Sequence, residues 1–155
     1  MLRLTRQADY GILLLAEMAS SAPGAIVAAS ELAATTGLPM PMVSKTLKVL
    51  AREGLLVSVR GPRGGYRLSR RAEDISVADV VSALEGPIAM TSCSETSGGD
   101  CGIEAKCRVH GNWLKLNRVV IGALAGLSLA EMAEPSPPRL VRLDELARSA
   151  SAGGI

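Results

Sequence analysis

Glycine and proline divide the first 87 residues into short segments, and the order of these segments constrains the fold more than any other feature. Apolar residues at helical spacing predict helices over 5–20, 31–36 and 41–53. Thr5 and Ser30 are expected to cap the first two of these helices. A turn at Gly37 is expected to separate the second helix from the third.

A basic hairpin is expected after these three helices. The chain alternates over 55–60 and 66–68, and the residues between them, Gly-Pro-Arg-Gly-Gly, are typical of a hairpin tip. Helix, short helix, turn, helix and hairpin is the order of a winged helix-turn-helix. We therefore predict a mainly α fold of the α+β winged-helix class.

Two more helices are expected beyond the hairpin. Ser76 and Asp79 have the spacing of a capping box, and they predict a helix that ends at Gly86-Pro87. The longest periodic segment predicts one continuous helix over about 109–133. Its apolar residues recur in steps of three and four, and they are Trp113, Leu116, Val120, Ala123, Leu127 and Ala130. Such a stripe must be covered, either by a partner or by the rest of the chain around a core helix.

Composition excludes several classes of protein. The chain is long enough for one core, and 48% of its residues are apolar. Because only 2% of the residues are aromatic and none is Phe, that core must be aliphatic. No run reaches the roughly 18 apolar residues of a membrane span, and no secretory signal is visible. The chain has one histidine, no nucleotide-binding loop and no catalytic Ser/His/Asp set, so we expect no enzyme.

Positive charge is concentrated around the third helix and the hairpin. Residues 45–71 hold eight of the 17 basic residues against one acid, Glu53, which favours a polyanion as partner. The N-terminal residues of the second helix of such a motif enter the DNA major groove, and arginines at a wing tip suit the minor groove. The candidate DNA-binding residues are Met40, Met42, Ser44, Lys45 and Lys48 on the helix, and Arg60 and Arg63 on the hairpin.

All three cysteines and the only histidine lie within one short segment. Cys93, Cys101, Cys107 and His110 form the pattern C-x7-C-x5-C-x2-H, with Gly98, Gly99 and Gly102 in the loop. Three thiols cannot all pair within one chain, so metal or redox chemistry in a reducing cytoplasm is the simpler reading. Four interpretations remain open at this point: structural zinc, an iron–sulfur cluster, a thiol redox switch and three unrelated free cysteines, the last disfavoured by the clustering.

The chain resembles a known family in residues 1–134. The matching parts are residues 2–10, the helix-turn-helix, the wing string 59–68, the segment 77–83, the cysteine loop and the long helix. In this order they resemble the Rrf-type bacterial iron–sulfur cluster sensing transcription regulators, typified by IscR and NsrR. The C-x2-H ending resembles the IscR type, while the seven-residue gap between Cys93 and Cys101 is longer than expected for it.

The resemblance implies both a cofactor and partners. It implies that Cys93, Cys101, Cys107 and His110 bind a [2Fe–2S] cluster. It also implies a cytoplasmic homodimer that binds a pseudo-palindromic operator in double-stranded DNA, as a repressor or other regulator of SUF or ISC cluster-assembly genes. The alternatives are a nitric oxide-sensing [4Fe–4S] repressor and a zinc-stabilised interaction module.

Four parts of the chain are expected on this basis. They are a winged DNA-binding domain over 1–87, a cluster-ligand loop over 88–108, a dimerisation helix over 109–134 and a C-terminal tail over 135–155. Within the tail, one or two helical turns are expected over 140–147, followed by a frayed end over 149–155.

Overall fold

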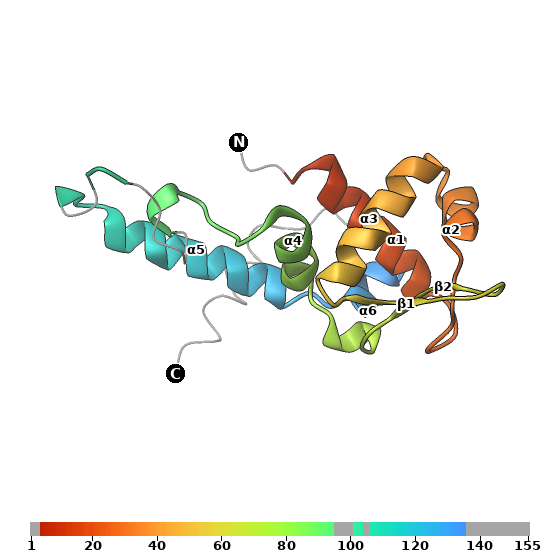
Figure 1. Ribbon diagram of the computed structural model, residues 1–155. Coiled ribbons are helices and arrows are strands. Elements are labelled where there is room, and N and C mark those ends of the chain that lie inside the picture. Colours follow the sequence, from red (N-terminus) through yellow and green to blue (C-terminus); the bar gives the residue numbers. More distant parts are fainter. Residues whose placement is uncertain (1–3, 95–100, 104–105, 136–155) are drawn as a thin grey trace.

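The computed structural model describes residues 4–94, 101–103 and 106–135 of the chain. A compact body of helices carries a two-stranded hairpin on one side, and one long helix, α5, projects from it on the other (Figure 1). The elements in chain order are α1 (Arg6–Ala19), α2 (Ala29–Thr36), α3 (Met40–Arg52), β1 (Leu56–Val59), β2 (Gly65–Leu68), η1 (Ala72–Asp74), α4 (Val77–Glu85), η2 (Ser92–Ser94), α5 (His110–Ala125) and α6 (Leu129–Ala133).

An aliphatic core holds the body together, as the composition predicts. Leu14 and Leu15 of α1 pack with Leu47 and Leu50 of α3, and all four side chains are fully buried. The Thr5 hydroxyl accepts a hydrogen bond from the Ala8 amide at 3.3 Å, which confirms the predicted cap of α1.

The helix-turn-helix is formed by α2 and α3. Gly37 ends α2 with φ +69°, a left-handed conformation that glycine adopts without steric cost. Ser30, however, does not cap α2, because the helix begins at Ala29, two residues before its expected start, and its N-cap is Ala28. The reason lies in Val27, which exchanges two 2.9 Å backbone hydrogen bonds with Tyr66 of β2 and so holds the chain extended up to the helix start.

The hairpin is antiparallel, and its register pairs Leu56 with Leu68 and Val59 with Gly65. Because Val27 pairs with Tyr66, the residue before the α2 N-cap lies against β2 as a third short partner. Gly65 is required at this contact, since a Cβ atom there would collide with the backbone carbonyl of Val27. The wing is therefore fixed to the helix-turn-helix through backbone atoms.

The predicted continuous helix over 109–133 is wrong, because the chain forms two helices there. α5 ends at Ala125, and α6 begins after Ser128, whose hydroxyl accepts from the Glu131 amide while the Glu131 carboxylate accepts from the Ser128 amide. This second capping box starts a new helix in the middle of the apolar period.

The second of these helices belongs to the body of the fold. α6 packs against α1 and η1, and Leu129 is almost completely buried in the core. Of the segment 109–134, for which one dimerisation helix was expected, α5 forms only His110–Ala125, with Leu127 in the break and Ala130 on α6.

The remaining expectations about fold concern membrane spans and the tail. Within residues 4–94, 101–103 and 106–135, no helix has the length and apolar character needed to cross a membrane. The turns expected over 140–147 and the end expected over 149–155 lie outside the described residues, as does nearly all of the tail over 135–155.

Candidate DNA interface and metal-ligand segment

One face of α3 is free to meet a partner. Val43, Leu47 and Leu50 are buried against the body, while Met42, Lys45 and Lys48 are exposed at helical spacing on the opposite side. The exposed face thus combines two ammonium groups with an apolar methionine, as required for contacts with phosphates and thymine methyl groups.

Two predicted residues lie at the margins of this face. Met40 is exposed at the first position of α3, whereas Ser44 is half-buried on its flank. The preceding residue, Pro39, forms no side-chain cap, so the N-terminus of α3 presents its partial positive charge outward. Ser44 is consequently a weaker candidate for base contact than Met42 or Lys45.

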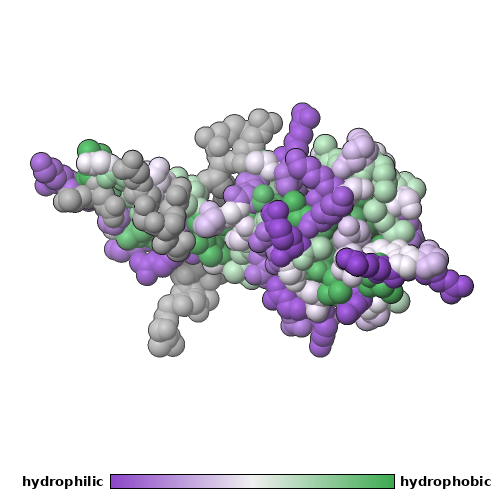
Figure 2. Space-filling view, in the orientation of Figure 1, coloured by the Kyte–Doolittle hydropathy of each residue, from purple (hydrophilic) through white to green (hydrophobic). Residues whose placement is uncertain are grey.

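The wing carries two exposed arginines at its tip. Arg60 follows β1 and Arg63 lies in the turn, which the Gly64 amide closes by donating to the Gly61 carbonyl at 2.9 Å. Figure 2 shows a hydrophilic end where the hairpin projects from the body.

Acidic side chains form ion pairs with part of the basic segment 45–71, but not with the basic residues that are predicted to bind DNA. Arg52 pairs with Glu53 at 2.9 Å, Arg70 with Asp79 at 3.6 Å and Arg71 with Glu73 at 3.2 Å. In the last pair the hydrogen bond raises the pKa of Arg71 and lowers the pKa of Glu73. Among the described residues, Lys45, Lys48, Arg60 and Arg63 form no ion pair. The predicted DNA-binding residues therefore retain uncompensated charge.

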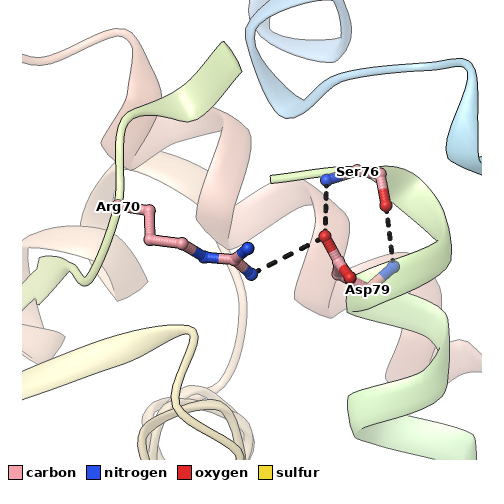
Figure 3. A network of polar contacts seen from close by, with 3 residues as sticks. All are labelled: Arg70, Ser76 and Asp79. Atoms are coloured by element: carbon pink, nitrogen blue, oxygen red, sulfur yellow. Dashed lines mark hydrogen bonds and ion pairs between the residues drawn. The ribbon is translucent and has the colours of Figure 1, made fainter. Parts of the chain in front are cut away.

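The base of the wing is tied to α4. One carboxylate oxygen of Asp79 accepts a 2.9 Å hydrogen bond from the Ser76 amide and lies 3.6 Å from the Arg70 guanidinium (Figure 3). The Ser76 hydroxyl accepts from the Asp79 amide at 3.1 Å, so the predicted capping box is complete. Arg70 follows β2 closely, and Asp79 thus links the wing to the helix that leads into the cysteine segment.

The four predicted ligands lie on the segment between α4 and α5 and on the first residue of α5. Cys93 is in η2, Cys101 and Cys107 are in the loop, and His110 begins α5. All three cysteines are free thiols, and all four side chains are half-buried. Over the described residues, no three His, Cys, Asp or Glu side chains are gathered closely enough to hold a metal ion.

Local hydrogen bonds orient the two ends of this segment. At one end, the Thr91 hydroxyl lies 3.2 Å from the sulfur of Cys93. At the other, the His110 amide donates to the Cys107 carbonyl at 3.3 Å, so these two residues are adjacent across the start of α5. The residues fit a cluster by their donor chemistry, because iron–sulfur clusters bind both cysteine thiolates and histidine imidazoles, and zinc accepts a set of three cysteines and one histidine.

The helix α5 is apolar and largely uncovered. Trp113, Leu116 and Ala123 of the predicted seam are exposed and Val120 is half-buried. Leu127, also exposed, lies beyond the helix end. Figure 2 shows hydrophobic residues among hydrophilic ones along this projecting part. Such a surface favours a protein partner.

Sequence reasoning missed Asn117, the only residue of α5 that is buried. Its signal was present, since an asparagine interrupts the apolar stripe between Trp113 and Val120. Asn117 hydrogen-bonds the backbone of residues 88 and 90, ahead of Cys93.

Comparison with known proteins decides the family. The family model of Rrf2, described as an iron-dependent transcriptional regulator, matches residues 4–135. The chain belongs to the Rrf2 family. It is a transcriptional regulator that binds DNA and not an enzyme, and its winged-helix fold confirms the predicted class.

Curated relatives and the solved structures of similar proteins agree with the assignment of this chain to the Rrf2 family. The chain is 29% identical to the regulator IscR of Aliivibrio salmonicida, over 84% of this chain and 77% of that one. Its fold is similar to that of CymR, the global cysteine regulator of B. subtilis (TM-score 0.65, 25% identity, 88% and 100% of the chains). It is also similar to T. potens IscR (TM-score 0.59, 25% identity, 99% and 93% of the chains).

Proposed function

We propose that this Rrf2 regulator senses an iron–sulfur cluster, most simply [2Fe–2S], held by Cys93, Cys101, Cys107 and His110. The observation that carries the proposal is the place of these residues: every thiol of the chain lies on the one segment that joins the winged domain to α5. Similarity to IscR over most of the chain and the iron-dependent character of the family support the same assignment.

The segment with the predicted ligands contacts α5 at both of its ends, so ligation would affect the position of α5. Its first cysteine lies in η2, which contacts α5, and its last ligand is the first residue of α5. A bound cluster supplies cross-links of iron to these side chains. Ligated in this way, Cys93 and His110 would hold η2 against the start of α5 and would thereby restrict the direction of α5.

Operator binding would change with that direction. After α5 the chain passes through residues 126–128, where the Val77 amide donates to the Leu127 carbonyl at 2.9 Å, and α6 then packs against α1 of the winged domain. In a homodimer formed through α5, a change at the ligand segment would alter the spacing of the two α3 helices, and hence the affinity for a pseudo-palindromic operator.

We propose a class of regulated genes from the proposed cluster and from the likeness to IscR. A regulator that reads cluster occupancy in the cytoplasm suits the control of iron–sulfur assembly genes, such as those of the SUF or ISC systems, as a repressor. This part of the proposal rests on the likeness to IscR.

Metal and sulfide analysis of anaerobically purified protein tests the proposal. We expect a coloured protein with iron and acid-labile sulfide in equal amounts, and a loss of both in Cys101→Ala. Ser92→Ala, an exposed neighbour of Cys93 in η2, is the matched control and should retain both. A colourless protein with stoichiometric zinc contradicts the proposal and favours a zinc-stabilised module.

The cluster type needs its own measurement. The electronic absorption spectrum separates [2Fe–2S] from [4Fe–4S], and a titration with nitric oxide identifies a nitric oxide sensor if the cluster reacts in proportion to the gas added. A slow or absent reaction supports the assembly regulator.

A second candidate is a regulator of cysteine metabolism that holds no cluster. The structural likeness to CymR favours it. Protein without iron, sulfide or zinc, whose DNA affinity changes with added cysteine or its precursors, would establish this function instead.

A further inference from the structure

Asn117 is a buried amide in a helix that is otherwise exposed or half-buried. Asn117 is 6% exposed, and no other residue of α5 is buried. Since burying an amide without hydrogen-bond partners costs free energy, a buried asparagine is expected only where the fold supplies those partners.

Both ends of the Asn117 amide are satisfied by the chain that follows α4. The Met90 amide donates to Oδ1 at 3.0 Å, and Nδ2 donates to the Ile88 carbonyl at 3.3 Å. The side-chain amide of Asn117 thus binds a backbone donor and a backbone acceptor of the same segment. Aspartate lacks the donor and leucine lacks both groups, so asparagine is specified here by its chemistry.

A short chain of hydrogen bonds connects this contact with the first predicted ligand. The residue after Met90 is Thr91, whose amide donates to the Ser94 hydroxyl at 3.0 Å and whose carbonyl accepts from the Ser94 amide at 2.9 Å. These bonds close η2, which contains Cys93, and the Thr91 hydroxyl lies 3.2 Å from the Cys93 sulfur. Asn117 therefore sets where η2 begins, and η2 sets where the sulfur lies.

The same helix carries the last predicted ligand. His110 is the first residue of α5, about two helical turns before Asn117, and η2 lies beside α5 (Figure 1). One rigid element therefore fixes two ligands that are distant in sequence: His110 directly, and Cys93 through Asn117.

We propose that Asn117 is a positioning residue, which anchors the segment 88–94 on α5 and thereby presets the Cys93 thiol for ligation with His110. The inference rests on the proposed cluster function and adds a residue that does not touch the cluster. Without the anchor, the first ligand must be ordered each time the cluster binds, so the cluster is held less tightly.

Two substitutions separate the hydrogen bonds from the space that they fill. Asn117→Leu keeps a similar volume and removes both hydrogen bonds, while Asn117→Ala removes the side chain as well. The matched control is Asn112→Ala, because Asn112 is the only other asparagine of the chain, lies on the same helix and is exposed. Thermal melts followed by circular dichroism show that each variant is folded.

The first measurement uses metal-free protein and needs no cluster. Amide hydrogen exchange at Met90, followed by NMR, should be faster by at least about ten-fold in both Asn117 variants and unchanged in Asn112→Ala. Equal exchange in parent and Asn117 variants overturns the anchor.

The second measurement uses protein reconstituted with iron and sulfide and then challenged with an iron chelator. The loss of visible absorbance should be faster by on the order of 10- to 100-fold in the Asn117 variants and unchanged in the control. Faster exchange at Met90 with an unchanged rate of cluster loss overturns the positioning role. A parent that takes up no iron and sulfide contradicts the proposed function and the ligand role together, whereas the Met90 exchange still decides whether Asn117 anchors the segment.

Discussion

Ser76 and Ser128 face each other across an antiparallel bridge, and each of them caps a helix. Ser76 starts α4, which leads into the cysteine segment, and Ser128 starts α6, which follows α5. The start of α4 and the start of α6 thus lie side by side. The bridge fixes the base of the projecting helix to the same α4 that Arg70 links to the wing.

Removal of the second cap should loosen this base. Ser128→Ala deletes the hydroxyl that accepts from Glu131, and we expect the free energy of unfolding to fall by about 1 kcal/mol. Ser82→Ala, an exposed serine in the middle of α4, should cost nothing or stabilise slightly. Denaturant unfolding followed by circular dichroism compares the two, and equal losses would contradict the capping role.

The same cap predicts a pH dependence. Hydrogen bonds from the Ser128 backbone and side chain lower the pKa of Glu131. A lowered folded-state pKa contributes stability above the ordinary glutamate pKa, about 4.3, that is lost as the pH falls through the folded-state value. In Glu131→Gln the stability deficit relative to the parent should therefore shrink on acidification, and a constant deficit would contradict the assignment. Glu134→Gln is the control, since its side chain forms no hydrogen bond or ion pair among the described residues.

The α3 face should supply the electrostatic part of DNA binding. Lys45→Ala should weaken binding to every sequence and reduce the slope of log affinity against log salt by about 1. Lys115→Ala removes an equally charged, exposed residue of α5 and should leave both quantities unchanged. Fluorescence anisotropy over a range of salt concentrations measures the slope, and equal slopes for the two variants would place the DNA elsewhere.

The wing depends on the absence of a side chain at Gly65. In Gly65→Ala the new Cβ would meet the Val27 carbonyl, and separation of the two segments should cost about 1–3 kcal/mol. A helical glycine with open space around it, Gly122, provides the control, and Gly122→Ala should not lower the melting temperature. An unshifted melting temperature for Gly65→Ala would refute the tight contact.

The exposed face of α5 should join two copies of the chain. Leu116→Glu places a charge in the predicted seam and should convert a dimer into a monomer, as measured by light scattering. Leu13→Glu alters a leucine of α1 that is similarly exposed, at 43% against 42%, and should keep the dimeric mass. A dimer that survives Leu116→Glu would exclude this face.

Local signals in the sequence predicted most of the fold. Thr5, Gly37 and Ser76 each act within one helix turn of their own position, and the structure confirms all three. The predicted helix cap at Ser30 is wrong because a contact between Val27 and Tyr66, which are distant in sequence, decides where α2 begins. Propensity contains no information on such a pairing.

The break after α5 was hidden for a different reason. Leu124, Leu127 and Ala130 continue the helical period, so hydrophobic spacing alone predicts no interruption. The Ser128-x-x-Glu131 capping box is a local signal that can start a helix there, whereas the bridge of Ser128 to Ser76 is a tertiary contact that the sequence pattern does not reveal. The candidate ligands could be found because they are the only cysteines and histidine of the chain, whereas Asn117 acts only through residues 88–90, which tertiary structure brings to it.

The most direct test of the account is the affinity of one DNA fragment for the same anaerobic protein before and after its iron and sulfide are removed. The fragment is selected from a random pool by the loaded protein, and Cys101→Ala serves as the permanently stripped reference. We predict that removal shifts the affinity by more than ten-fold, to the value of Cys101→Ala, and that reconstitution restores it. Identical affinities in the loaded and stripped states would contradict the claim that this regulator senses a cluster.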